Sequence, residues 1–184
     1  VGSEMCIRDS SITSICFHPE GKYLATGSFD KTARLWDLNG QEIAIFRGHQ
    51  NTVMSVCFHP EGKYLATGSG DNTARLWDLN GQEIAIFRGH QDIVWSVCFH
   101  PKGKYLATGL LDGTARLWDL QGQEIAIFRG HQNSVTSVCF HPEGKYLATG
   151  SYDNTARLWD LQGQEIAIFR GHQDFVTSVC FHPE

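Results

Sequence analysis

The chain repeats a unit of 41 residues, and this repeat constrains its fold more than any other feature of the sequence. The dipeptide Gly-His recurs at residues 48, 89, 130 and 171, and Trp-Asp recurs at 36, 77, 118 and 159. Residues 48–88, 89–129 and 130–170 are identical in 33 of 41 columns, while 11–47 and 171–184 are parts of the same unit. Because a unit this short cannot bury both of its faces alone, we expect the copies to stack into an array.

Within one copy the pattern predicts four short strands joined by tight turns. Residues 53–58 are β-branched and aromatic and end at His59-Pro60-Glu61-Gly62, where proline and glycine favour a type I turn. Further strands are expected over 63–69 and 73–77, and an Asn-Gly pair predicts the hairpin into a fourth strand at 83–87. Each unit is therefore expected to be an antiparallel meander.

The Gly-His and Trp-Asp dipeptides, at this spacing and with this turn chemistry between them, resemble the WD40 repeats of β-propellers over residues 11–184. The resemblance implies an all-β fold in which four-stranded blades surround an axis, with strands a to d ordered from the axis outward. We expect these blades to form an incomplete ring. The resemblance predicts four complete blades at about 12–47, 53–88, 94–129 and 135–170, and the first strand of a fifth blade within 176–184.

Residues 1–10 lie outside the repeat. Their sequence, from Val1 to Ser10, resembles the translation of a sequencing adapter, and the repeat begins directly after it. We therefore expect this segment to be an artefact that takes no part in the fold. Since the last unit also stops after 14 residues, we interpret the chain as a fragment of a larger WD40 scaffold or sensor protein.

The resemblance also implies a structural tetrad in each blade, in which linked His, Thr, Asp and Trp side chains satisfy one another's buried polar groups. A Ser/Thr-His-Asp set can also be read as a hydrolase triad, but its recurrence in every copy favours a structural role. The first blade is expected to have a partial set because residue 8 is Arg rather than His. The predicted tetrads are His49, Thr67, Asp71 and Trp77; His90, Thr108, Asp112 and Trp118; and His131, Thr149, Asp153 and Trp159, with the partial set Thr26, Asp30 and Trp36.

A cysteine and a histidine also recur once in each copy, as in Cys57 and His59. Zinc sites usually bring several such ligands together from paired motifs, which this spacing does not supply. We expect each cysteine to be a small buried thiol on the innermost strand and each histidine to cap the following turn. No metal, cofactor or catalytic residue is therefore predicted, and one unpaired thiol per blade favours a reducing, cytoplasmic location.

The eight columns that differ among the three full copies indicate where a partner binds. Six of them flank the d–a and b–c connections, which open onto the same rim in a propeller of this family. Large apolar side chains on loop tips are typical binding anchors, whereas drift alone should leave small polar residues on both rims. We expect Ile93, Trp95, Leu110 and Leu111 to be the strongest anchor. The predicted contact residues, here called the variable rim, are Phe29, Asn51, Thr52, Met54, Gly70, Asp92, Ile93, Trp95, Leu110, Leu111, Tyr152 and Phe175.

The composition argues against several classes of function. The net charge of −5 leaves no basic surplus for a nucleic-acid backbone, and the apolar runs are far shorter than the roughly 20 residues that span a bilayer. We interpret the chain as a non-catalytic module that binds a protein or peptide on the variable rim. One alternative is the recognition region of a signalling enzyme, an NTPase or kinase, with its catalytic domain elsewhere; another is a metal or hydrolytic site built from the Cys and His columns. Open blade edges also predict self-association.

Overall fold

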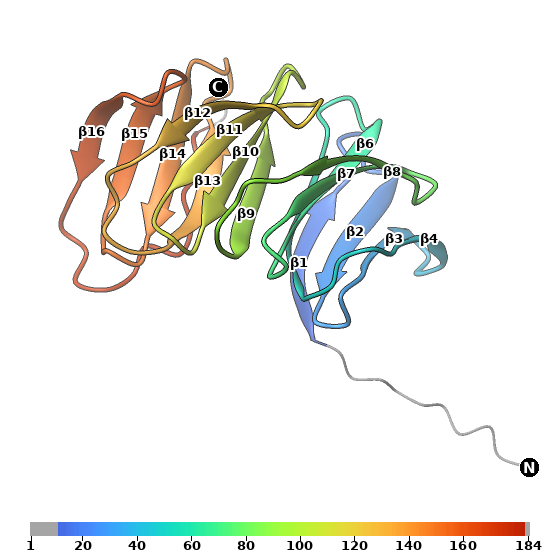
Figure 1. Ribbon diagram of the computed structural model, residues 1–184. Helices are drawn as coiled ribbons and strands as arrows, with labels where there is room; N and C mark the ends of the chain where they lie inside the picture. The colour runs from blue at the N-terminus through green and yellow to red at the C-terminus, as the bar shows by residue number, and fades with distance from the viewer. Residues whose placement is uncertain (1–10, 183–184) are drawn as a thin grey trace, which may run out of the picture.

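The computed structural model describes residues 11–182, which form four antiparallel sheets of four strands each and no helix (Figure 1). We call these sheets blades 1 to 4 in chain order. Within each blade, strands that follow one another in the sequence are neighbours in the sheet. The strands are β1 (Ile12–Phe17), β2 (Tyr23–Ser28), β3 (Ala33–Asp37), β4 (Glu42–Phe46), β5 (Val53–Phe58), β6 (Tyr64–Ser69), β7 (Ala74–Asp78), β8 (Glu83–Phe87), β9 (Val94–Phe99), β10 (Tyr105–Leu110), β11 (Ala115–Asp119), β12 (Glu124–Phe128), β13 (Val135–Phe140), β14 (Tyr146–Ser151), β15 (Ala156–Asp160) and β16 (Glu165–Phe169).

The turn after the first strand of each blade follows from its sequence. In blade 2 the His59 carbonyl accepts a hydrogen bond from the backbone N–H of Gly62 at 2.7 Å, and Gly62 has a φ of 68°. Glycine is favoured there because a Cβ strains this backbone conformation. The imidazole of His59 also caps the turn, since its Nδ1 accepts the backbone N–H of Glu61 at 3.1 Å.

The hydrophobic core lies between neighbouring blades. Leu35 and Phe46 of blade 1 are each 1% exposed and belong to one buried cluster with Val53, Leu65 and Trp77 of blade 2. The same columns form corresponding clusters between blades 2 and 3 and between blades 3 and 4. Blades 2 and 3 therefore each contribute their two faces to two different boundaries, which is why one repeat needs its neighbours.

Two polar links also recur at the blade boundaries. The hydroxyl of Ser14 accepts the backbone N–H of Val56 at 3.1 Å, and Nε2 of His18 lies 3.2 Å from the Gly62 carbonyl oxygen, to which it donates. Both links repeat at the next two boundaries with the same distances to within 0.1 Å. The turn histidine therefore joins two blades in addition to capping its own turn.

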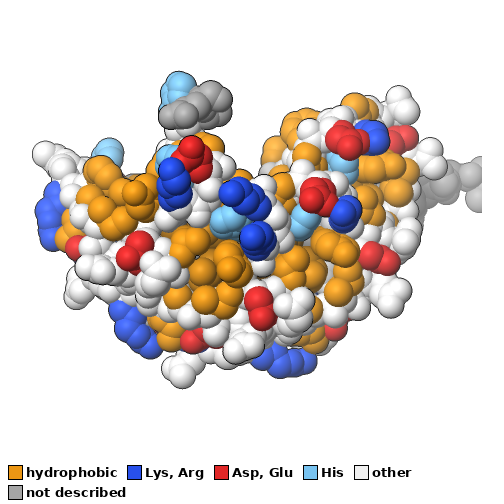
Figure 2. All heavy atoms as spheres, turned by 90° about the horizontal axis from the view of Figure 1, so that it is seen from above, with side chains coloured by type: hydrophobic (Ala, Val, Ile, Leu, Met, Phe, Trp, Pro, Cys, Tyr) orange, Lys and Arg blue, Asp and Glu red, His pale blue; other side chains and the backbone are white. Residues whose placement is uncertain are grey.

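The four blades form an open arc. Viewed from above, the molecule has a notched outline rather than a closed ring (Figure 2). The all-β fold with four complete four-stranded blades is confirmed. Residues 176–181 follow blade 4 where the fifth-blade strand is expected, since Val176 N–H donates to the Ser151 carbonyl at 3.0 Å, but no strand ladder forms there within the described residues.

The segment 1–10, which we interpret as an adapter artefact, lies outside the described residues, as do residues 183–184. Residues 11–182 include no helix of the length and apolarity that crossing a membrane requires.

Candidate functional site

A cavity of about 640 Å³ lies where the innermost strands β1, β5, β9 and β13 meet, and we call it the axial cavity. One repeat column supplies a lining residue from every blade and from the segment after blade 4. Serine hydroxyls from the next column add a polar surface, including Ser14, Ser55 and Ser96. The lining residues of that first column are Thr13, Met54, Trp95, Thr136 and Thr177.

A β-bulge in each blade places this column. In blade 2, Val53 pairs with Ser69 and Ser55 pairs with Gly68, so that Met54 is the extra residue between two register positions. Thr13, Trp95 and Thr136 take the same place in blades 1, 3 and 4. Bulges often re-aim a side chain beside a binding site, and here they direct the most variable column of the innermost strand toward the cavity.

Five aromatic or apolar side chains line the cavity together with seven serine and threonine residues. Phe29 is 58% exposed, and Tyr152 lies against Phe175 with ring centroids 4.4 Å apart. Trp95 is half-buried, and its indole Nε1 is buried with no hydrogen-bond partner among the described residues. The cavity thus combines apolar surface with hydroxyl groups, a mixture typical of sites that bind a side chain or small ligand.

The variable rim divides into three groups in the structure. Phe29, Met54, Trp95 and Tyr152 line the axial cavity. Leu110 does not belong to the surface at all: it is 0% exposed and packs in the core between blades 2 and 3, which corrects its expected role as an anchor. The remaining rim residues lie outside the cavity lining: Asn51, Thr52, Gly70, Asp92, Ile93, Leu111 and Phe175.

Hydrogen bonds explain why several of these remaining residues shape loops. The Asn51 side chain donates to the Gly70 carbonyl at 3.1 Å, and Leu111 N–H donates to the Ile93 carbonyl at 3.0 Å. Asp92 accepts the backbone N–H of Ile93 at 2.8 Å. The first two contacts join the d–a loop to the b–c loop of the same blade, whereas the third lies within the d–a loop.

The sequence reasoning missed Thr13, Thr136 and Thr177 of this column, and it also missed the other lining residues Ile12, Ser14, Ser55, Ser96 and Ser178. It favoured large apolar side chains as anchors and retained only Met54 and Trp95 of this column. The variability of the whole column was the signal that identifies all five positions.

The structure brings the tetrad residues together in blade 2. Trp77 Nε1 donates to Thr67 Oγ1 at 2.9 Å, Thr67 donates in turn to His49 Nε2 at 2.7 Å, and His49 Nδ1 donates to Asp71 at 2.8 Å. Burial favours a higher pKa for Asp71, but hydrogen bonds from His49, Thr73 and the backbone of Gln50 outweigh it and hold the pKa well below its ordinary value. The chain of bonds thus stabilises the carboxylate form.

Blade 4 contains the same arrangement. His131 lies 2.7 Å from Thr149 and 2.8 Å from Asp153, and Trp159 donates to Thr149 at 2.8 Å. Burial lowers the pKa of His131, and hydrogen bonds that outweigh burial bring the pKa of Asp153 to about 2. The repeated geometry, buried between strands, is that of a structural link.

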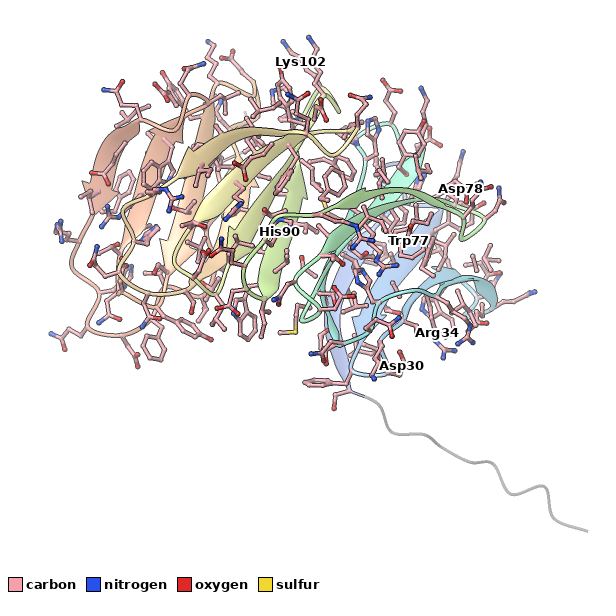
Figure 3. All side chains as sticks on the ribbon, in the orientation of Figure 1. Asp30, Arg34, Trp77, Asp78, His90 and Lys102 are labelled. Carbon is pink, nitrogen blue, oxygen red and sulfur yellow. The ribbon has the colours of Figure 1, made fainter. Side chains whose placement is uncertain are left out.

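Blade 3 departs from the predicted tetrad. His90 Nε2 lies 3.1 Å from Thr108 and Trp118 donates to the same hydroxyl at 3.0 Å, but no hydrogen bond joins His90 to Asp112 in residues 11–182. Figure 3 shows His90 between blades 2 and 3. Burial and the nearby guanidinium of Arg116 lower the pKa of His90 to about 4.

Blade 1 holds the partial set. Trp36 Nε1 donates to Thr26 at 2.9 Å, as in the other blades. Asp30 accepts hydrogen bonds from Thr32 at 2.6 Å and from Arg34 at 3.2 Å. Both Asp30 and Arg34 are labelled in Figure 3, at the end of the blades opposite Lys102.

The cysteine column lies on the innermost strands. Cys16, Cys57, Cys98 and Cys139 are half-buried free thiols, and Cys180 is an exposed free thiol. Residues 11–182 contain no group of three or more His, Cys, Asp or Glu side chains placed to hold a metal ion.

Four-stranded antiparallel sheets that stack around an axial cavity, each with a hydrogen bond from Trp to Thr, define a segment of a β-propeller. The family "WD domain, G-beta repeat" matches this chain at residues 5–37, 40–78, 81–119, 122–160 and 163–184. The chain therefore belongs to the WD40 repeat family.

Curated relatives match short stretches of the chain. The general transcriptional corepressor TUP1 of Saccharomyces cerevisiae is 44% identical over 46 residues, 24% of this chain and 6% of that protein. The Notchless protein homolog of Arabidopsis thaliana is 46% identical over 39 residues, covering 21% and 8%, and the nuclear distribution protein nudF of Aspergillus oryzae is 58% identical over 33 residues, covering 18% and 7%. Each match covers less than a tenth of the relative. Since these matches run over 33 to 46 residues, each corresponds to about one repeat.

Proposed function

We propose that this chain is an interaction module that binds a protein or peptide partner at the axial cavity and the surrounding variable rim. Membership of the WD40 family supports the general part of this proposal, because WD40 domains generally bind protein partners and are generally not catalytic. The particular site rests on the geometry of this chain.

The observation that carries the proposal is the convergence of one variable column on the axial cavity. The cavity of about 640 Å³ lies within the range of roughly 300–1,000 Å³ that is usual for ligand sites. It is lined by Met54 and Trp95, where other copies have threonine, and by Phe29 and Tyr152 from the loops. A partner that inserts an apolar or aromatic side chain here would bury these surfaces, as central anchors of interfaces do.

A selection from a phage-displayed random peptide library tests the proposal. Peptides are selected on the wild-type chain, and their affinities are compared for Trp95→Ala, Tyr152→Ala and a control, Lys102→Ala, which lies at the opposite end of the blades (Figure 3). Removal of a central aromatic anchor typically costs about 2 kcal/mol or more, so we expect each cavity variant to weaken binding at least roughly tenfold. Lys102→Ala should leave affinity unchanged. Selected peptides that bind all three variants like the wild type would contradict the proposed site.

We also propose that the module works in a reducing, cytoplasmic compartment. The five described cysteines are free, one for each copy of the unit, and each stands at the same place on or beside an innermost strand. Free thiols persist in compartments where glutathione and thioredoxin keep them reduced. Fractionation of the source cells with an antibody to the repeat would test this location, and recovery in an oxidising compartment would contradict it.

A further inference from the structure

Every internal blade boundary buries the same apolar columns, but the outer face of blade 4 leaves them open. Phe46, Phe87 and Phe128 end blades 1 to 3 and are each at most 1% exposed. Phe169 is the same column in blade 4 and is 56% exposed. We call this outer surface the trailing face, and it comprises Tyr146, Ala148, Ala156, Leu158 and Phe169.

The opposite surface of blade 1 is also apolar and exposed. Ile12, Ile15 and Phe17 of β1 are 62%, 63% and 62% exposed. The residues of the same columns in blade 2, such as Val53 and Phe58, are at most 5% exposed because they pack against blade 1. We call this surface the leading face, and it comprises Ile12, Ile15, Phe17, Leu24, Trp36 and Leu38.

We propose that the leading face of one copy of this chain packs against the trailing face of a second copy, repeating the boundary that joins neighbouring blades within the chain. The two faces have the columns that are buried together at all three internal boundaries. The polar links match as well. If the junction has the geometry of an internal boundary, His141 of one copy lies opposite the Gly21 carbonyl of the other, as His100 lies 3.2 Å from the Gly144 carbonyl. The occupant is therefore a second copy, because the chain already contains three examples of this interface.

The number of copies follows from closure. The contact joins two different surfaces, so it either closes into a ring or continues as a fibre. Two copies of residues 11–182 supply eight blades, at the upper end of the usual range of about four to eight, whereas three copies would supply twelve. We therefore infer a closed dimer in which each leading face covers the partner's trailing face.

The segment after blade 4 competes for part of this interface. Val176, Val179 and Phe181 stand four repeat lengths after Ile12, Ile15 and Phe17 and occupy on blade 4 the place that a partner's β1 would take. This segment leaves Phe169 more than half exposed, whereas a partner blade would cover it. Its hold on blade 4 includes a bond from Val176 N–H to the Ser151 carbonyl at 3.0 Å and one from Val179 N–H to Ser137 Oγ at 3.1 Å. Association must displace it.

Sedimentation velocity of the full chain over a concentration series tests the proposal. The monomer mass is 20.6 kDa, and we expect a discrete species of twice that mass. Ile15→Glu and Phe169→Glu each place a charge in one of the two faces, so either variant alone should weaken dimerisation by more than about tenfold. Ile84→Glu is the control, since Ile84 is 48% exposed on the outer strand of blade 2 and belongs to neither face. Far-ultraviolet circular dichroism establishes that each variant is folded.

Mixing the two variants distinguishes this contact from a symmetric one. The intact trailing face of Ile15→Glu and the intact leading face of Phe169→Glu can form one junction. The mixture should therefore contain a heterodimer, although each variant alone dimerises weakly. Dimerisation of Phe169→Glu by itself would show that leading faces pair with each other and would overturn the proposal, as would a wild-type chain that stays monomeric. Deletion of residues 173–184 should tighten the dimer, and unchanged affinity would overturn the proposed competition. Leu38→Glu, a second leading-face variant, should behave like Ile15→Glu.

Discussion

Asp112 makes no hydrogen bond with His90 within the described residues, although 41 residues earlier Asp71 and His49 lie 2.8 Å apart in the same repeat positions. Asp112 is exposed and instead accepts hydrogen bonds from Thr114. The Nδ1 atom of His90 is left buried without a partner. One of three otherwise equal links between strands is therefore incomplete.

The cause lies two residues before the aspartate. In blade 2, Ser69 Oγ accepts the backbone N–H of Asp71 at 3.1 Å and donates to the Asn51 carbonyl at 3.1 Å, which holds the aspartate beside its histidine. Blade 3 has Leu110 at this position, and a leucine side chain offers no acceptor. Leu110 instead adds apolar contacts to the core between blades. Blade 3 therefore lacks the hydrogen bond between His90 and Asp112 and has the buried Leu110 side chain in place of the serine.

A graft of the blade 2 turn should restore this link. We expect the triple variant Leu110→Ser, Leu111→Gly, Gly113→Asn to bring Asp112 onto His90 Nδ1, because it recreates the sequence that holds Asp71. Loss of Leu110 burial costs about 2–3 kcal/mol and a satisfied histidine returns about 1–3 kcal/mol, so the stability should change little. Proton NMR checks the bond: a low-field Nδ1–H signal of His90 should join those of His49 and His131. Leu111→Gly alone should add no His90 signal. If the triple variant also lacks this signal, the residue at position 110 is not what keeps Asp112 away from His90.

His90 should also make the chain sensitive to mild acid. Its pKa is about 4 in the folded chain, because burial and then Arg116 disfavour the charged form, while an unfolded histidine has a pKa of about 6.5. The unfolded state therefore binds more protons between these values, and the free energy of unfolding falls as the pH drops from about 6.5 to about 4. The loss is on the order of 3 kcal/mol. Urea unfolding at several pH values should show a shallower loss for His90→Gln, whereas the control His172→Gln, at an exposed position, should follow the wild type.

The threonine at the centre of each tetrad should matter most where it serves two partners. Thr67→Val removes the partner of both Trp77 Nε1 and His49 Nε2, and both groups are buried. Since each buried unsatisfied group costs about 1–3 kcal/mol, we expect a loss of about 2–5 kcal/mol in urea unfolding. Thr26→Val is the matched control, because Thr26 accepts from Trp36 without a described histidine, and it should cost roughly half as much. Equal losses would mean that the histidine link adds nothing.

The local parts of the fold were predictable from the sequence because each depends on neighbouring residues. Pro60 and Gly62 determine a turn whatever the rest of the chain does, and the period of 41 residues then assigns every other strand. The bulge at Met54 was not predictable, since it depends on how Val53 and Ser55 pair with the adjacent strand. The axial cavity follows from that register.

The site residues were predicted less well for a related reason. A column-by-column reading treats Asp112 like Asp71, but the position of each aspartate depends on the residue two places before it. The same reading placed Leu110 on the rim because the loop column varies, whereas its side chain turns into the blade boundary. Contacts between residues 44 apart, such as that of His59 with Gly103, leave no trace in a single repeat.

The turn glycines offer a test of that contact between blades. Gly21 and Gly103 occupy equivalent turns of blades 1 and 3, with φ values of 68° and 65°. An alanine at either position therefore strains the backbone by about 1–2 kcal/mol. A Cβ at Gly21 would have no neighbour within 4 Å, whereas a Cβ at Gly103 would overlap the imidazole ring of His59. Gly103→Ala must therefore also push His59 from the Gly103 carbonyl and from Phe99, whose ring centroid lies 5.3 Å away.

We expect Gly103→Ala to lower the free energy of unfolding by about 1–3 kcal/mol more than Gly21→Ala, the usual cost of losing a buried polar link. Urea unfolding of the two variants measures this difference. In a His59→Ala background the obstruction is gone, so Gly103→Ala should then cost no more than Gly21→Ala does in the wild type. If the excess cost persists without the imidazole, the glycine is required for its own turn and His59 is not the link that joins blades 2 and 3.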